Sequence, residues 1–282
     1  MLYNVPLPLE SGYRTALVNV GAMKNRGIEL TLNSVNIDTK DFTWQTSLNY
    51  SFNKNEIDKL YNDLERVGNY FVGQSINVIY TKRFGGIWQS DEAEIAKIYN
   101  AEPGDYKIID RNRNNIIDDD DRDFVGQTTP QFFGSFSNTF KSHGFDLTIF
   151  LTYAGGHKIY NPFAYLDSYS PSANMSPDYY HNYWTPERPS NKYPRLGSTN
   201  SQLYETDGMY QKGDYIRLKN LELGYTLPRN IANKVYASNI RVYASVQNLV
   251  TFTKYTGFDV ETSNANPYPA CRVFMGGLTV NF

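Results

Sequence analysis

The fold class of this chain is decided by residues 271–282, CRVFMGGLTVNF. Successive side chains of a β-strand point to opposite faces. One face of this segment carries Phe274, Gly276, Leu278, Val280 and Phe282, and the other carries Met275, Gly277, Thr279 and Asn281. Apolar residues outside and small or polar residues inside are typical of membrane-barrel strands. The segment therefore predicts the closing strand of a transmembrane β-barrel, with an ordinary soluble sheet edge as the alternative.

Composition narrows the functional classes. The 282 residues have a formal net charge of -2 and a mean hydropathy of -0.53, which argues against a nucleic-acid partner. Tyr (24) and Phe (16) are abundant, and such rings suit β-strands and membrane-interface belts. We expect the single Cys271 to be a small packed side chain, and His143, His157 and His181 to be polar surface.

The chain has neither a run of roughly 18 apolar residues nor a signal peptide at its start, MLYNVP. No transmembrane helix is therefore predicted. The chain is either soluble or the C-terminal portion of a longer exported polypeptide, and we favour the second interpretation.

A period of two recurs along the sequence. Strands are expected at residues 2–5, 28–32, 42–52, 78–88, 132–140, 145–153, 221–227, 240–250 and 274–282. Helix is expected for no more than a turn or two, near residues 92–98 and 55–64. These patterns predict an all-β, antiparallel transmembrane β-barrel, of which this chain supplies the C-terminal part, about nine strands.

The connections fit this interpretation when residue 282 is placed on the periplasmic side. Residues 89–130 and 156–213 become long outer loops, whereas residues 141–144 and 228–238 become inner turns. The hairpin at residues 38–41 is expected on the outer side, which is unusual for so short a turn. Because an open sheet edge cannot face lipid, the piece needs partner strands from outside this sequence.

Several segments resemble SusC/RagA-type TonB-linked outer-membrane proteins. The resemblance rests on these motifs, in the family's order: NVGAMKNRGIE (19–29), NYSFNKN (49–55), PGDYK (103–107), DRNRNNIIDDDDR (110–122), YIRLKNL (215–221), GYTLP (224–228) and QNLVTFTKYTGFD (247–259). Two departures stand out. The family's Asp-Pro-Glu reads Asp259-Val-Glu261, and the acidic loop lacks its glycine.

The resemblance implies the C-terminal barrel portion of an outer-membrane transporter for glycans or peptides. It also implies a SusD-like lipoprotein partner, and TonB as a partner through an N-terminal region with a plug domain. Neither the plug nor the TonB box is expected within these residues. Outer-membrane lipid is expected around the barrel.

The acidic loop has oxygen donors at the spacing of an EF-hand, which predicts a structural Ca²⁺ site. The expected ligands are Asp110, Asn112, Asn114, the backbone carbonyl of Ile116, Asp118 and Asp121. Asn115 stands where glycine is usual, although asparagine tolerates the left-handed conformation. The alternative is a solvated acidic loop or an Asp–Arg network.

Residues 156–213 carry nine tyrosines, Trp184 and six prolines. Aromatic rings on a stiff loop suit stacking on a sugar or docking a protein partner. Ligand or partner contact is therefore predicted for Tyr179, Tyr180, Tyr183 and Trp184. The alternative is that these rings pack the loop onto itself.

Nothing in the sequence nominates a catalytic or cofactor-binding residue, so an enzyme is not expected. The leading hypothesis is part of a nutrient transporter in the cell outer membrane. The second is a secreted calcium- and carbohydrate-binding β-sandwich, in which residues 42–52 would form a core strand.

Overall fold

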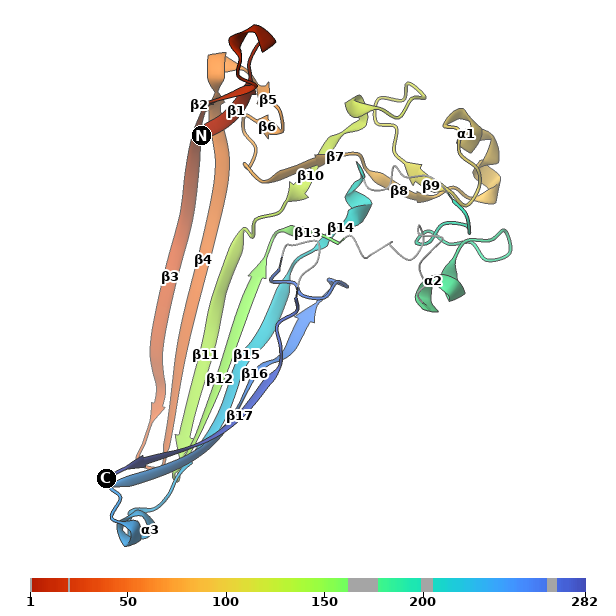
Figure 1. Ribbon diagram of the computed structural model, residues 1–282. Helices are drawn as coiled ribbons and strands as arrows, with labels where there is room; N and C mark the ends of the chain where they lie inside the picture. The colour runs from red at the N-terminus through yellow and green to blue at the C-terminus, as the bar shows by residue number, and fades with distance from the viewer. Residues whose placement is uncertain (1, 20, 162–176, 199–204, 263–267) are drawn as a thin grey trace.

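The computed structural model describes residues 2–19, 21–161, 177–198, 205–262 and 268–282. Its largest element is a seven-stranded antiparallel sheet (Figure 1). The strands, in spatial order, are β17 (Val273–Asn281), β16 (Asn239–Thr253), β15 (Tyr215–Thr226), β12 (Phe145–Gly155), β11 (Phe132–Ser142), β4 (Phe42–Leu60) and β3 (Gly21–Asp38). Each strand pairs with its neighbour in the chain or with the next long strand, so the sheet is a continuous meander.

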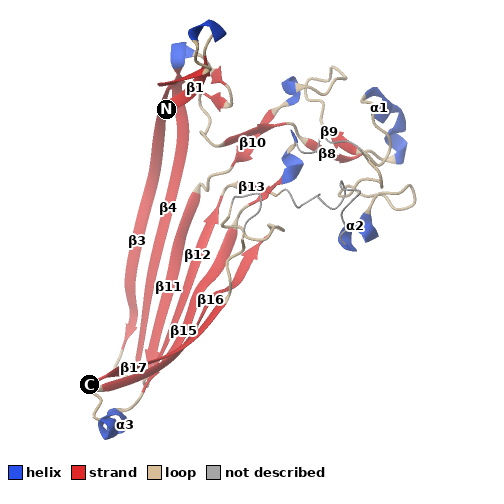
Figure 2. Ribbon diagram, in the orientation of Figure 1, coloured by secondary structure: helices blue, strands red, loops and turns tan. Residues whose placement is uncertain are grey.

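The remaining strands form two-stranded pairs. These pairs are β1 (Leu2–Pro6) with β2 (Thr15–Asn19), β5 (Arg66–Val67) with β6 (Tyr70–Phe71), β7 (Val78–Thr81) with β10 (Asp123–Gln127), β8 (Phe84–Ile87) with β9 (Tyr106–Ile108), and β13 (Lys158–Tyr160) with β14 (Tyr210–Lys212). The α-helices are short: α1 (Ala93–Ile98), α2 (Pro177–Asn182) and α3 (Arg229–Ala232). Figure 2 shows these helices beyond the ends of the long strands.

The three shortest connections of the large sheet lie at one end, which we call the turn end. They are residues 39–41, His143-Gly144 and residues 227–238. His143 and Gly144 have φ of 49° and 85°, and positive φ at both positions is what a two-residue type I′ hairpin requires. The Ser142 hydroxyl donates to the Asp41 carbonyl (2.9 Å), which joins the first two turns.

The expected outer position of the hairpin at residues 38–41 is therefore wrong. Residues 78–88 do not form one long strand of the sheet. They form β7 and β8, which pair with β10 and β9. The sheet thus has seven strands, and every long connection leaves the opposite end, which we call the loop end (Figure 1).

The sheet has one apolar and one polar face, as the alternation predicts. Trp44, Phe140 and Leu147 lie in one cross-strand row of the apolar face. Many apolar side chains of this face are open to solvent, including Ile28 (68% exposed) and Phe274 (74%). No second sheet packs on it within the described residues. The β-sandwich hypothesis, which requires a packed core strand at residues 42–52, is not supported by this arrangement.

The packed core lies in the long connections instead. Ile87, Tyr106, Trp184 and Met209 form one buried cluster, although they come from segments far apart in the sequence. We call the packed parts of these connections, residues 78–127, 158–160, 177–198 and 205–212, the loop lobe. None of the described helices has the length and apolar character needed to cross a membrane.

Candidate functional site

The acidic loop lies in the loop lobe between β9 and β10. Asp110 accepts hydrogen bonds from the backbone N–H of Arg113 (2.6 Å) and Asn115 (2.8 Å) and from the Tyr99 hydroxyl (3.0 Å). Asn115 has φ of 65°, so it adopts the left-handed conformation that glycine would take there. Desolvation raises the pKa of Asp110, but the hydrogen bonds from Asn115 and Tyr99 outweigh it and the pKa lies below its ordinary value.

The other predicted side-chain ligands also accept hydrogen bonds from the loop backbone. The acceptors are Asn112 (from Asn114 N–H), Asn114 (from Ile116 N–H), Asp118 (from Asp120 N–H) and Asp121 (from Arg111 and Asp118 N–H). Within the described part of the chain, no group of three or more His, Cys, Asp or Glu side chains is placed to hold a metal ion. The loop therefore folds around its own amides, and a site here depends on amide and carbonyl oxygens as well as carboxylates.

The four aromatic residues predicted to contact a ligand or partner have different surroundings. Tyr179 and Trp184 are only 1% and 6% exposed, and the indole N–H of Trp184 donates to Gln89 Oε1 (3.0 Å). Tyr180 is 61% exposed, whereas Tyr183 is half-buried with the Arg188 guanidinium 4.5 Å from its ring centre. Burial thus assigns two of the four to packing and leaves Tyr180 accessible. Tyr165, Tyr169 and Tyr204 of the same segment lie outside the described residues.

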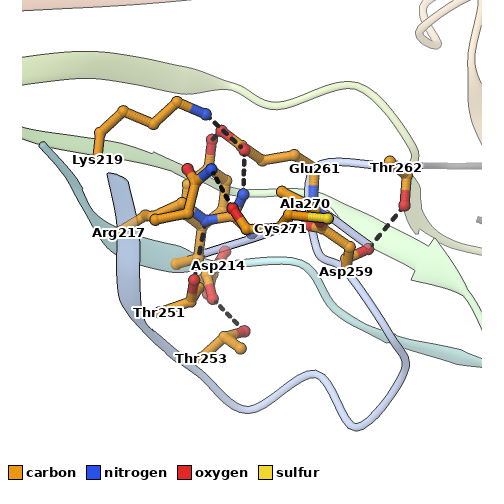
Figure 3. A network of polar contacts seen from close by, with 12 residues as sticks. Asp214, Arg217, Lys219, Thr251, Thr253, Asp259, Glu261, Thr262, Ala270 and Cys271 are labelled. Carbon is orange, nitrogen blue, oxygen red and sulfur yellow. Dashed lines mark hydrogen bonds and ion pairs between the residues drawn. The ribbon is translucent and has the colours of Figure 1, made fainter. Parts of the chain in front are cut away.

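A buried charge network on the polar face of the sheet was not predicted (Figure 3). The Arg217 guanidinium pairs with both Asp259 and Glu261, and its Nε donates to Thr251 Oγ1 (2.8 Å). The side chains of Arg217 and Asp259 are each 4% exposed. Lys219 Nζ lies 3.2 Å from Glu261 at the more open edge. We call these five side chains the Arg217 network.

Local backbone structure positions both Arg217 and Asp259 in this network. A β-bulge between Leu218 and Asn220 interrupts the pairing of β15 beside Arg217. Asp259 accepts the backbone N–H groups of Glu261 (3.0 Å) and Ala270 (2.8 Å), which fold the connection between β16 and β17 around it. Desolvation raises the pKa of Asp259. The hydrogen bonds from Arg217 and from the two backbone amides lower the pKa by more, so it lies below its ordinary value. The network fastens this connection to β15.

A second charge network lies on the same face at the turn end. Arg241 bonds Asp146 through Nε (3.0 Å) and Glu222 through Nη2 (2.7 Å). A Cβ atom on Gly224 would lie 2.3 Å from the Arg241 guanidinium, so glycine leaves the room that this side chain occupies. The alternation placed all these residues on the polar face, but it carried no information on their pairing.

Two surface expectations are wrong. His157 is 8% exposed and lies against Gly213, and its Nδ1 has no hydrogen-bond partner among the described residues. Burial lowers the pKa of His157, and the nearby Asp214 carboxylate opposes that shift. Cys271, expected to be packed, is exposed because it follows the connection that Asp259 holds, just before β17 begins.

Known proteins match this chain over its whole length. The TonB-dependent receptor P3 of Formosa agariphila is 32% identical over 100% of this chain, which covers 31% of P3. The TonB-dependent receptor SusC of Bacteroides thetaiotaomicron is 28% identical over 100% of this chain, which covers 29% of SusC. The solved RagAB peptide transporter superposes with a TM-score of 0.80 and 26% identity, covering 100% of this chain and 32% of its own.

The resemblance to SusC/RagA-type TonB-linked outer-membrane proteins is thereby confirmed. The fold class is confirmed with it: the sheet is an antiparallel part of a transmembrane β-barrel. The RagAB peptide importer in its closed-closed state also superposes, with a TM-score of 0.77. The names of these relatives describe receptors and transporters.

The chain spans about a third of the length of the relatives that it matches. No protein-family model matches it.

Proposed function

We propose that this chain is the C-terminal barrel segment of a TonB-dependent transporter in the cell outer membrane. The transporter imports glycans or peptides together with a SusD-like lipoprotein. The single observation that carries the proposal is a sheet with an unpacked apolar face and a polar, charge-bearing face. In water the exposed apolar area would be a large liability, whereas in a bilayer it is the surface that lipid requires.

Strand length and direction support the membrane role. A tilted membrane strand needs about 9–11 residues, and β11 and β12 have 11 residues each. β3 and β4 have 18 and 19 residues, so they extend past that thickness at the loop end, where β1, β2, β5 and β6 lie beside them (Figure 1). Short turns at one end and long connections at the other match the periplasmic and outer sides of an outer-membrane barrel.

The lipoprotein partner and the substrate are assigned by analogy with the SusC and RagAB proteins. The loop lobe lies at the end that this orientation directs outward, and it offers the exposed ring of Tyr180. TonB and a plug domain would act through an N-terminal region. The turn-end network of Arg241, Asp146 and Glu222 lies on the face that such a plug would contact.

Spin labels on neighbouring residues test the membrane orientation directly. Leu147 and Val246 lie on the apolar face, and their neighbours Thr148 and Gln247 lie on the polar face. In outer membranes, labels on the first pair should be accessible to oxygen and shielded from a polar nickel chelate. Labels on the second pair should show the lower oxygen accessibility. Equal shielding of all four in a compact, detergent-free globule would reject the transporter and favour the β-sandwich.

A functional test addresses the partner and the substrate. The membrane-embedded protein should copurify with a SusD-like lipoprotein. Tyr180→Ala should weaken this association, because it removes the exposed ring and leaves the buried Tyr179 unaltered. Uptake of labelled oligosaccharides and oligopeptides by cells that carry or lack the protein would then separate the two substrate classes. Cells without the protein taking up both classes normally would contradict the transport role.

We also propose that the acidic loop holds a structural Ca²⁺ ion. The support is the spacing of Asp110, Asp118 and Asp121 around a left-handed Asn115. A dissociation constant of about 10⁻⁴–10⁻³ M, typical of extracellular modules, is expected from calorimetric titration. Asp121→Asn should weaken binding, whereas Asp119→Asn, whose carboxylate pairs with Arg122 (2.9 Å), should not. Equal binding by both variants would locate the ion elsewhere.

A further inference from the structure

A hollow of about 750 Å³ opens at the loop end of the sheet, across β12, β15 and β16. Tyr153, Ile216 and Phe252 line it and lie opposite one another in a single cross-strand row. Ile216 is 49% exposed and Phe252 is 64% exposed, so no other described part of the chain covers this floor. A volume of this size falls within the range of about 300–1,000 Å³ that small-molecule ligands fill.

The row belongs to the apolar face of the sheet. Ile216 alternates with Arg217, which points to the polar face, and Phe252 alternates with Thr251, which bonds Arg217. The floor of the hollow is therefore on the face opposite the charge networks and the space that a plug would fill, although Thr251 of the Arg217 network borders the hollow. If the proposed function holds, on which this inference rests, the hollow faces lipid.

The loop-end rim of the hollow is polar and mainly basic. Lys212 and Lys254 both line it and are exposed. Among the salt bridges of the described residues, none involves either lysine. Asp214 is the acidic residue of the rim, and one of its carboxylate oxygens accepts the backbone N–H of Gly156 (2.8 Å). The hollow thus combines an apolar floor toward the membrane centre with two lysines toward the loop end, neither of which pairs with an acidic side chain in the described part of the chain.

We propose that this hollow binds a phosphate-bearing, acylated lipid of the outer leaflet. One acyl chain lies along Tyr153, Ile216 and Phe252, and the phosphate lies between Lys212 and Lys254. Long lysine side chains can keep their stems against apolar surface while the ammonium reaches the headgroup level. Basic pockets at the membrane surface recognise anionic headgroups in the same way.

Two strands farther along the sheet, β3 and β4, also carry positive charge near the loop end. Arg26 and Lys54 are opposite each other on β3 and β4, one step beyond the apolar pair Ile28 and Phe52. Lys54 pairs with Glu56 (2.8 Å), so part of this charge is neutralised within the protein. The rim of the hollow lacks such a salt bridge, which is why we place the lipid there and not on β3 and β4.

The test measures lipid retained by the complete membrane-embedded protein in phosphatidylcholine nanodiscs. The probe is monophosphoryl lipid A, compared with the same lipid after removal of its phosphate and with inorganic phosphate alone. Native mass spectrometry reports the bound fraction. Lys212→Gln combined with Lys254→Gln should lower retention of the phosphorylated lipid about 25-fold, roughly fivefold for each lysine. The double control Lys59→Gln with Lys234→Gln, at exposed positions away from the hollow, should retain it fully.

A second variant isolates the apolar floor. Phe252→Ser should lower retention of the phosphorylated and dephosphorylated lipid alike, because it removes acyl-chain contact and leaves both lysines. Equal retention of the two lipids by the unaltered protein would overturn the proposal, as would binding of inorganic phosphate alone. If the lipid-retention results fail while spin labels on Leu147 and Val246 still report a lipid environment, the lipid site is refuted and the proposed transport function is not affected.

Discussion

Replacing Arg217 by methionine is expected to release the connection between β16 and β17 from the sheet. Methionine keeps much of the packing volume but removes the charge that compensates Asp259. Breaking a buried ion pair by deleting one partner costs about 3–5 kcal/mol. Asp259 keeps two backbone N–H donors in the variant, so the lower end, about 3 kcal/mol, is the appropriate figure. This free energy is lost from the closure of the β16–β17 connection against the sheet, because the pairing of β15 with β16 does not depend on Arg217.

Hydrogen–deuterium exchange measures this closure at the amides that the network protects. The backbone N–H groups of Glu261 and Ala270 both donate to Asp259. A local opening that is easier by about 3 kcal/mol accelerates their exchange about 150-fold, if exchange proceeds through that opening. Amides in the middle of β12 provide the internal reference, and their exchange should not change.

Lys219→Met is the matched control. It removes a cation from the same network at a more open position, where a surface pair contributes about 0–1 kcal/mol. The pair Arg217→Met with Asp259→Asn should recover part of the protection, because no uncompensated charge remains. Unchanged exchange in Arg217→Met, or an equal effect from Lys219→Met, would refute the reasoning.

Three further predictions concern single positions. Burial lowers the pKa of His157 in the folded protein below the ordinary value of 6.5. The loop end should therefore lose stability as the pH falls below 6.5, because the unfolded chain takes up the proton more readily than the folded one. A proteolysis rate of this region that does not change with pH would contradict this. Gly277→Ala should destabilise the barrel by about 1–3 kcal/mol, since its Cβ would lie 2.3 Å from the Tyr243 ring, whereas Gly276→Ala, with its nearest neighbour at 3.8 Å, should be close to neutral in denaturant titrations. Asn138→Leu should lower stability by about 1–3 kcal/mol in the same titration, despite its place on the apolar face, because it leaves an indole N–H without its acceptor.

The sequence was sufficient for the faces of the sheet. Residues 42–52 and 145–153 alternate with one exception each, Thr46 and Phe150, and this alternation is enough to predict which face meets lipid. It was not sufficient for the strand count. Residues 78–88 have the composition of a strand, but they form two pieces of four residues each, separated by Lys82 and Arg83. Because residues 78–88 were counted as a barrel strand, the hairpin at residues 38–41 was predicted on the outer side, whereas it lies at the turn end.

The charge networks could not be predicted because they depend on pairing across distance. Arg217 and Asp259 are 42 positions apart, and either could have paired with many other charged groups. The quoted motifs YIRLKNL and QNLVTFTKYTGFD contain both residues, and that was the available signal. The burial of Tyr179 and Trp184 depended likewise on the partner segment, because an aromatic ring suits a core and a binding surface equally well.

The shared core of the loop lobe ties two long connections to each other. Ile87 comes from one connection and Trp184 from the other, and each fills space that the other segment leaves. A core substitution in one connection therefore requires a complementary substitution in the other, so the two segments are expected to change together. A chimera that receives residues 156–213 alone from a relative should lose the lobe, whereas one that receives both segments should keep it.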